Sequence, residues 1–330
     1  MPESALARLL VNLPGPDTVS QAAVAERAAT TLRPAGAFAR LDAVAAWLAA
    51  WQWTTTPRVR TPHVAVFGAD HGVAADGVSA YPAEVTGAMV AAMGQGVATV
   101  TALAAQVGAS FSFHDAGVGR PTGNIRTTDA MTVEEFDAAV QVGVEAVENV
   151  EADLLVFGEV GIANTTPAAA VSAAVLGGPP GDWAGPGTGV GGDALAAKRR
   201  VVEDAVARVG EVEPIEALRR LGGKELAATA GATLAARHRG IPVLLDGFIA
   251  TAAVLPLHAA EPAALDHVRA GHSSAEPGHV RQLAALGLDP LLSLDLRLGE
   301  GSGAVAAIPI VQVACAAVVD VATFEEFGLA

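Results

Sequence analysis

Short apolar runs alternate with longer stretches of helical spacing from about residue 60 to the end of the chain. Each run is followed by a glycine or an acidic residue. The runs cover residues 63–67, 110–114, 154–157, 241–245 and 291–294. Continuous apolar strands that alternate with helices are typical of a parallel sheet buried on both faces. The pattern therefore predicts an α/β fold built on such a sheet.

Helices are also expected at both ends of the chain. Apolar residues at helical spacing predict two helices over residues 18–32 and 37–51, which Pro34 and Gly36 separate. The most apolar stretch, residues 304–319, is shorter than a membrane span. We interpret it as a buried helix.

The composition narrows the class of protein. The 330 residues include 20 Lys and Arg against 35 Asp and Glu, so the net charge is −15 at pH 7. Such a charge repels phosphates and anionic headgroups, which argues against nucleic-acid and membrane partners. Hydrophobic residues make up 52% of the chain, enough for a large core, and the single cysteine, Cys315, excludes an internal disulfide. No signal peptide is apparent at the start, and we expect a cytoplasmic protein.

Acidic residues stand at the ends of three predicted strands: Asp70, Glu159 and Asp246. In parallel sheets of this kind, ligands bind beyond the carboxyl ends of the strands. Each acid alone is equally well explained as a helix cap, because aspartate commonly accepts from helix amides. Several acids at one sheet edge favour a binding site.

A glycine-rich stretch, residues 68–82, follows the first predicted strand. It contains Asp70, His71 and Tyr81, the only tyrosine of the chain. Its glycines let the backbone approach a ligand closely. The Asp-His pair lacks the spacing of a helical metal site, so no metal is expected. A glycine-rich turn in which Asp70 binds its own backbone explains the same residues.

The segment after the third predicted strand enters a helix. Thr166 is expected as the N-cap, with Pro167 in the first helical turn. The free amides there, together with Asn164 and Thr165, suit an anion or a ribose. A capped helix without a ligand is the alternative, but capping does not explain Glu159 at the end of the strand.

Two further glycine-rich segments carry charged side chains. Residues 185–192 and Lys198 suit a phosphate, although the Gly-Lys-Ser/Thr of a P-loop and the strand that precedes a dinucleotide fingerprint are both missing. In residues 297–304, Glu300 lies between glycines at the start of the most apolar helix. A poorly solvated carboxylate there is a stronger base than a surface glutamate. An acid favoured by the helix dipole is the alternative explanation.

The histidines give little further information. His272 and His279 flank a polar loop that is a candidate site wall. His238, His258 and His267 are expected at the surface or in loops. The sequence shows no Ser-His-Asp or Cys-His arrangement.

Together these segments resemble the family of nicotinate-nucleotide–dimethylbenzimidazole phosphoribosyltransferases, from about residue 32 to residue 327. The family's Gly-Asp-His-Gly-Val…Gly-Val-Ser-Ala-Tyr-Pro, Gly-Glu-Met-Gly-Ile-Gly-Asn-Thr-Thr and Gly-x-Gly-Thr-Gly stretches correspond to residues 69–82, 158–166 and 185–189. Its Asp-Gly-Phe-Ile, Ser-x-Glu-Pro-Gly-His and Leu-Gly-Glu-Gly-Ser/Thr-Gly-Ala stretches correspond to residues 246–249, 274–279 and 298–304. Several long motifs in one order make the resemblance specific.

The resemblance implies a fold and an activity. The expected fold is a Rossmann-like parallel α/β domain over residues 61–330 plus a smaller helical domain, to which residues 1–60 and part of the C-terminal region contribute. The expected activity, in cobalamin synthesis, transfers phosphoribose from nicotinate mononucleotide to 5,6-dimethylbenzimidazole. The products are alpha-ribazole 5'-phosphate and nicotinate. A homodimer without a cofactor is expected to carry it out.

The resemblance also implies roles for individual residues. Glu300 is the expected general base. The expected ribose and nucleotide ligands are Glu159, Gly161, Asn164, Thr165 and Thr166. The expected phosphate ligands are Gly187, Thr188, Gly189 and Lys198. The expected base pocket is lined by Asp70, Ser79, Tyr81 and Leu298, with Asp246 and His279 as a further site wall.

The sequence departs from the family's pattern at several places. Val160 and Ala163 replace a Met and a Gly of the glutamate motif, Ala83 and Ala88 stand where glutamines are frequent, and residues 33–39 differ from the family's Lys-Pro-x-Gly-Ser-Leu-Gly. These changes leave open another base, such as adenine or a phenol, and a non-catalytic paralogue that binds a nucleotide or base. The missing strand before the glycine-rich loop argues against a nicotinamide-dependent dehydrogenase.

Overall fold

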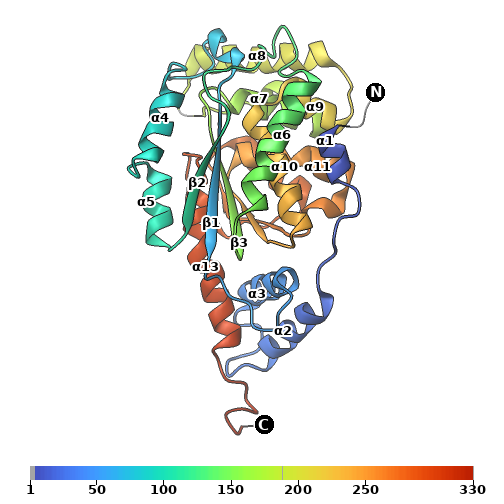
Figure 1. The fold of residues 1–330 in the computed structure, drawn as a ribbon, viewed down its shortest axis with the longest axis vertical. Coiled ribbons are helices and arrows are strands. Elements are labelled where there is room, and N and C mark those ends of the chain that lie inside the picture. Colours follow the sequence, from blue (N-terminus) through green and yellow to red (C-terminus); the bar gives the residue numbers. More distant parts are fainter. Residues whose placement is uncertain (1–3, 188, 330) are drawn as a thin grey trace.

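Five strands form one parallel sheet in the computed structural model, which describes residues 4–187 and 189–329 (Figure 1). They are β1 (Pro62–Ala69), β2 (Ser110–Gly117), β3 (Leu154–Val160), β4 (Val243–Leu245) and β5 (Val268–Ala270), in the order β2-β1-β3-β4-β5. All neighbouring strands pair in parallel, so their carboxyl ends share one edge. The chain order reverses between β1 and β3, which is the switch point where such sheets bind ligands.

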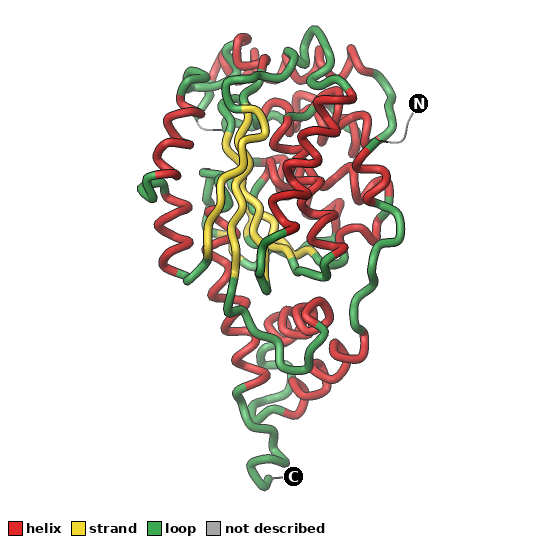
Figure 2. The backbone as a smooth tube through the Cα atoms, in the orientation of Figure 1, coloured by secondary structure: helices red, strands yellow, loops and turns green. Residues whose placement is uncertain are grey.

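Alternate strand residues face two separate cores, with helices on both faces of the sheet (Figure 2). Phe67 and Phe157 lie in the core of one face, which is covered by α6 (Val133–Glu148), α7 (Thr165–Leu176), α10 (Lys224–His238) and α11 (Phe248–Ala260). Val66 and Val156 lie in the core of the other face, which is covered by α3 (Ala39–Gln52), α5 (Thr99–Gln106) and α13 (Ser302–Val319). The predicted parallel α/β fold is confirmed.

A smaller helical cluster lies beyond the amino ends of the strands. There α2 (Thr18–Thr30) packs on α3, and Val24, Ala45, Ala49 and Val318 form its core. The helix α13 runs from the sheet into this cluster (Figure 1). The helices predicted over residues 18–32, 37–51 and 304–319 are confirmed, each within two residues at its ends.

The strand predictions were wrong at two places. Residues 291–294 do not join the main sheet, because only β7 (Leu292–Ser293) forms there, paired with the short β6 (His272–Ser273). The fifth strand of the sheet is β5, where Arg269 interrupts the apolar run that would have predicted a strand. His267, expected at the surface or in a loop, lies in the turn before β5 but is fully buried, and its Nε2 lies 3.0 Å from the Thr233 carbonyl oxygen.

The other elements connect these layers. They are α1 (Ala5–Leu9), α4 (Val85–Gly94), α8 (Gly192–Val209), α9 (Pro214–Leu221), α12 (Pro277–Leu286) and the 3-10 helices η1 (Gly72–Asp76), η2 (Pro180–Trp183) and η3 (Pro262–Leu265). By length and composition alone, α13 and the segment Val85–Gln106 are apolar enough to cross a membrane. That is a weak indication, because the core helices of soluble proteins meet the same criteria.

The helices α6 and α10 cross at glycines. A Cβ atom added to Gly143 of α6 would lie 1.8 Å from the carbonyl oxygen of Ala228 in α10. A Cβ atom added to Gly231 of α10 would lie 2.4 Å from the carbonyl oxygen of Val140 in α6. The two backbones are therefore in direct contact, which suits a chain with only 4% aromatic residues.

We expect Gly143→Ala to destabilise the fold by roughly 1–3 kcal/mol or more, because the added methyl group has to push two backbones apart. The free energy of unfolding from denaturant titration measures this. The matched control is Gly87→Ala in α4, where an added Cβ atom meets nothing within 4 Å. That variant should be as stable as the parent or gain up to about 1 kcal/mol. Equal stabilities for the two variants would contradict the close crossing.

Candidate active site

Three buried carboxylates from distant parts of the chain meet at the carboxyl edge of the sheet. Glu159 lies at the end of β3, Asp246 follows β4, and Glu300 precedes α13. Their exposed fractions are 5%, 2% and 4%. The backbone N–H of Glu300 donates to the Glu159 carbonyl oxygen at 3.1 Å, which ties the two acids together.

Glu300 combines an unusual backbone with an incompletely paired carboxylate. Its φ is 64°, a left-handed conformation that non-glycine residues rarely adopt. Its Oε2 is buried without a hydrogen-bond partner among the described residues. Burial raises the pKa of this carboxyl group, the Val100 backbone amide opposes the rise, and the charge of Asp246 adds to it. Glu300 is therefore a stronger base than a surface glutamate.

Glu159 is held by its neighbours and shielded from water. The side-chain amide of Asn164 donates to its Oε2. Burial raises the pKa of Glu159 well above its ordinary value, and the charges of Glu225, Asp246 and Glu300 raise it further. Burial and these like charges therefore favour the protonated form of Glu159.

A buried His–Glu pair lies beside the switch point. The Nε2 atom of His71, after β1, lies 2.9 Å from Oε1 of Glu225, and neither side chain is exposed. The turn at Gly161 fits against this pair, because a Cβ atom there would lie 3.1 Å from His71 Nε2. The sequence analysis missed Glu225. The available signal was the charged pair Lys224-Glu225, which opens an otherwise alanine-rich helix.

Lys198 is buried beside the glycine-rich loop, as the phosphate prediction requires. Its Nζ donates to Thr165 Oγ1 at 2.7 Å and to the Gly185 carbonyl oxygen at 3.1 Å. Burial lowers its pKa to about 8, although the charge of Glu276 favours the ammonium form. Glu276 Oε1 accepts from the Gly187 N–H at 2.8 Å. This amide, a predicted phosphate donor, is therefore hydrogen-bonded to a carboxylate of the protein.

The other two loop residues predicted as phosphate ligands, Thr188 and Gly189, provide little further evidence for a phosphate site. Gly189 has a left-handed φ of 128°, and a Cβ atom there would meet nothing within 4 Å. The predicted ligand Thr188 lies outside the described residues.

The start of α7 differs from the prediction. Asn164 occupies the N-cap position, whereas Thr166 lies buried in the first turn, so the prediction of Thr166 as the cap was wrong. The helix begins two residues earlier than predicted, directly after the turn at Ala163, whose φ is 77°. Ala163 also stands where the resembling family has glycine, the residue that adopts this conformation without strain.

The four residues predicted for the base pocket lie on loops. Asp70 Oδ2 accepts from the Gly119 N–H at 2.7 Å, and Ser79 Oγ accepts from the Tyr81 N–H at 3.2 Å. Tyr81 is 52% exposed and Leu298 is 43% exposed. Among the described residues, no hydrogen bond joins these four side chains to the buried carboxylates.

The two residues predicted as a further wall are enclosed. Asp246 accepts from backbone amides at the start of α13. The Nε2 atom of His279 lies 3.0 Å from Thr251 Oγ1, and its Nδ1 atom lies 3.0 Å from Ser274 Oγ. Burial lowers the pKa of His279 to about 3, so its ring is neutral at physiological pH.

Metal ligation, the lone cysteine and the cavities offer no second candidate site among the described residues. No group of three His, Cys, Asp or Glu side chains within residues 4–187 and 189–329 is arranged to hold a metal ion. Burial raises the pKa of the Cys315 thiol to about 12, which makes it unreactive. Two hollows of about 360 Å³ each share Arg269, and no predicted site residue lines either.

Known proteins resemble this chain over nearly its whole length. A family model described as phosphoribosyltransferase matches residues 13–329. A relative from Methylorubrum extorquens, named nicotinate-nucleotide–dimethylbenzimidazole phosphoribosyltransferase, is 50% identical over 316 residues, which cover 95% of this chain and 92% of the relative. A relative of the same name from Ruegeria pomeroyi is 50% identical over 321 residues, which cover 97% of this chain and 95% of the relative.

A solved structure of the same kind of enzyme extends the likeness to the fold. The structure from Thermus thermophilus superposes with a TM-score of 0.90 at 40% identity, covering 95% of this chain and 99% of that one. The motifs quoted above had predicted this relationship, and the comparisons confirm it. The chain therefore belongs to the family of nicotinate-nucleotide–dimethylbenzimidazole phosphoribosyltransferases.

Proposed function

We propose that this protein transfers phosphoribose from nicotinate mononucleotide to 5,6-dimethylbenzimidazole, giving alpha-ribazole 5'-phosphate and nicotinate. Relatives named for this activity match this chain over nearly their whole length. The observation in the molecule that supports it best is Glu300, a buried carboxylate with an unpaired oxygen beside Glu159 at the sheet edge.

The reaction needs one base and no general acid. The bond from the ribose C1' to the nicotinate nitrogen breaks, and its electron pair leaves with a ring that becomes neutral at nitrogen. One nitrogen of the benzimidazole forms the new bond to C1', and the N–H proton of its other nitrogen passes to a Glu300 carboxylate oxygen. A positioned base contributes typically about 10²–10⁴-fold to such a step.

The remaining rate enhancement comes from positioning and electrostatics. We assign Glu159 to the ribose, which its side chain would help to position. Gly161, Asn164, Thr165 and Thr166 would supply further contacts to the nucleotide. Lys198 and the amides of the glycine-rich loop would bind its phosphate.

We further propose a cytoplasmic homodimer with two domains. The cluster of α2, α3 and the end of α13 forms the smaller one. The apolar segment Val85–Gln106 is only 22% buried in the single chain, which suits a face covered by a second copy. Asp70, Ser79, Tyr81 and Leu298 are assigned to the benzimidazole side.

A panel of bases tests the function. We expect the protein, given nicotinate mononucleotide and dimethylbenzimidazole, to release nicotinate and form one α-ribonucleotide. Liquid chromatography with mass detection measures both products. Benzimidazole, adenine and phenol complete the panel, because Ala83 and Ala88 leave the choice of base open. Nucleotide binding without product from any base would contradict the proposal and favour a non-catalytic paralogue.

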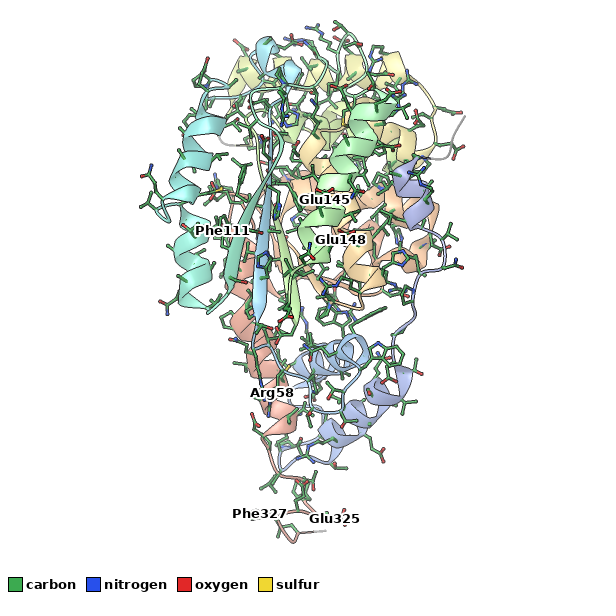
Figure 3. All side chains as sticks on the ribbon, in the orientation of Figure 1. Arg58, Phe111, Glu145, Glu148, Glu325 and Phe327 are labelled. Carbon is green, nitrogen blue, oxygen red and sulfur yellow. The ribbon has the colours of Figure 1, made fainter. Side chains whose placement is uncertain are left out.

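Glu300→Gln should lower kcat by roughly 10²–10⁴-fold, because the amide cannot accept the benzimidazole proton. The unfolding midpoint should stay close to that of the parent. The matched control is Glu148→Gln, an exposed glutamate at the last turn of α6 (Figure 3), which should leave kcat unchanged. Near-normal turnover of Glu300→Gln would remove this residue from the role of base.

Lys198→Met should raise the KM for nicotinate mononucleotide far more than it lowers kcat, because it removes the cation that faces the phosphate. The pKa of Lys198 is about 8, so the charge is present below that pH and lost above it. In the parent, kcat/KM for the nucleotide should therefore fall as pH rises through about 8.

The methionine variant should lack this alkaline limb. Arg200→Met removes an exposed positive charge from the same helix and serves as the control. An unchanged KM in Lys198→Met would reassign the phosphate site.

A further inference from the structure

The turn that carries Glu300 is held in an unfavourable conformation. Gly299, Glu300 and Gly301 have φ values of 71°, 64° and 87°, three left-handed residues in succession. Glycine adopts this conformation readily, but glutamate does not. Such a residue keeps its conformation only when its surroundings fix it, and this pattern is frequent at functional sites.

One side of the turn rests on β3. The Glu300 N–H donates to the Glu159 carbonyl oxygen at 3.1 Å. The backbone of Glu300 also presses against Gly158, where an added Cβ atom would lie 2.2 Å from the Glu300 carbonyl carbon and oxygen. Strand β3 therefore supports one side of the turn, where Gly301 also packs against Gly158.

The other end is held by Asp246. Its Oδ2 accepts from the Gly301 N–H at 3.2 Å, and its Oδ1 accepts from the Ala304 N–H at 2.9 Å. Gly301 is the N-cap of α13 and has no side chain to cap the helix. A carboxylate 55 residues away in the sequence, at the end of β4, does this instead. Asp246 is 2% exposed, so water does not compete for these amides.

A histidine also contacts the Asp246 carboxylate. The Nε2 atom of His272 lies 3.4 Å from Asp246 Oδ1. The ring packs on α13, because an added Cβ atom at Gly303 would lie 2.2 Å from it, and it stands edge-on to His279 at 6.0 Å. The buried Asp246 carboxylate therefore lies between the amides of the turn and the ring of His272.

We propose that Asp246 is the positioning residue for the general base: its two oxygens fix the turn 299–301, and through the turn they fix where the Glu300 carboxylate meets the benzimidazole. The inference rests on the proposed function. Asp246 touches no reacting atom in this scheme. It acts through two backbone amides and through its charge.

The charge of Asp246 should also affect how the activity depends on pH. The groups around the Glu300 carboxylate are Asp246 after β4, Glu159 in β3 and the Val100 amide at the start of α5, with His272 behind Asp246. Burial and Asp246 both raise the pKa of Glu300. Removing the Asp246 charge should therefore lower that pKa, and the acidic limb of the kcat profile should move to lower pH.

Asp246→Asn is the test. It keeps the shape but loses the charge and one acceptor, and we expect kcat to fall roughly 10- to 100-fold, since a misplacement of about 1 Å can cost about 10²-fold. The KM for nicotinate mononucleotide should change little, and the acidic limb should move to lower pH. Asp246→Glu keeps the charge but displaces both oxygens, so it should lose kcat while its acidic limb stays near that of the parent.

A capping aspartate elsewhere provides the control. Asp17 Oδ1 accepts from the Val19 and Ser20 N–H groups at the start of α2, far along the chain from the site. Asp17→Asn should lower the unfolding midpoint without moving kcat or the pH profile. If Asp246→Asn behaves in the same way, Asp246 only stabilises the fold and the proposal is overturned. The same conclusion follows if neither Asp246 variant folds.

A measurement without substrate separates this proposal from the proposed function. Carboxyl-carbon NMR of the full chain labelled at glutamate, assigned with Glu300→Gln, gives the titration of Glu300 directly. The pKa should be lower in Asp246→Asn than in the parent. If the parent makes no product from any base, the proposed function fails whatever this titration shows. If the parent turns over but the Glu300 titration and kcat are unchanged in Asp246→Asn, only the positioning role fails.

Discussion

The burial of several carboxylates at one sheet edge is the constraint on which the rest of the site depends. All are at most 5% exposed: Glu159, Glu225, Asp246 and Glu300. A buried carboxylate loses its water and repels its neighbours, so each one requires donors from the protein. Asp246 receives two helix amides, Glu159 a side-chain amide, and Glu225 the ring of His71. Glu225 and Glu300 each keep one oxygen unpaired among the described residues, but Glu225 is completely enclosed, so we assign the proton to Glu300.

The sequence predicts the parts of this arrangement that depend on strand ends. Asp70, Glu159 and Asp246 follow apolar runs, and parallel pairing brings strand ends to one edge whatever their separation along the chain. Contacts made through helices have no such signal. Glu225 lies in the first turn of α10, and only the fold brings it to His71. The short strand β5 was missed for a different reason, because Arg269 interrupts its apolar run, whereas the equally short β4 lies within the apolar run 241–245.

Local strain marks the same edge of the sheet. Glu300 and Ala163 are non-glycine residues with φ of 64° and 77°, and each such residue costs on the order of 1–3 kcal/mol. The two cases differ in what they explain. At Glu300 the proposed role as base requires the side chain, so a glycine could not replace it. At Ala163 the methyl group has no evident chemical task, and the resembling family has glycine there. The strain at Ala163 is a property of this chain for which the structure offers no functional reason.

Two groups assigned to the phosphate, Lys198 and the Gly187 amide, form hydrogen bonds with other groups of the protein. Lys198 donates to Thr165 and to a loop carbonyl, while the Gly187 amide donates to Glu276. Burial raises the pKa of Glu276 and lowers that of Lys198, so burial disfavours the charged form of both. A phosphate that displaces Glu276 from the loop would find its donors already oriented, and its charge would favour the ammonium form of Lys198. Under the proposed function, binding of the nucleotide would be coupled to the protonation of Lys198, whereas transfer would depend on the deprotonation of Glu300. The two requirements act in opposite directions as pH changes, and the enzyme needs both to hold in one range of pH.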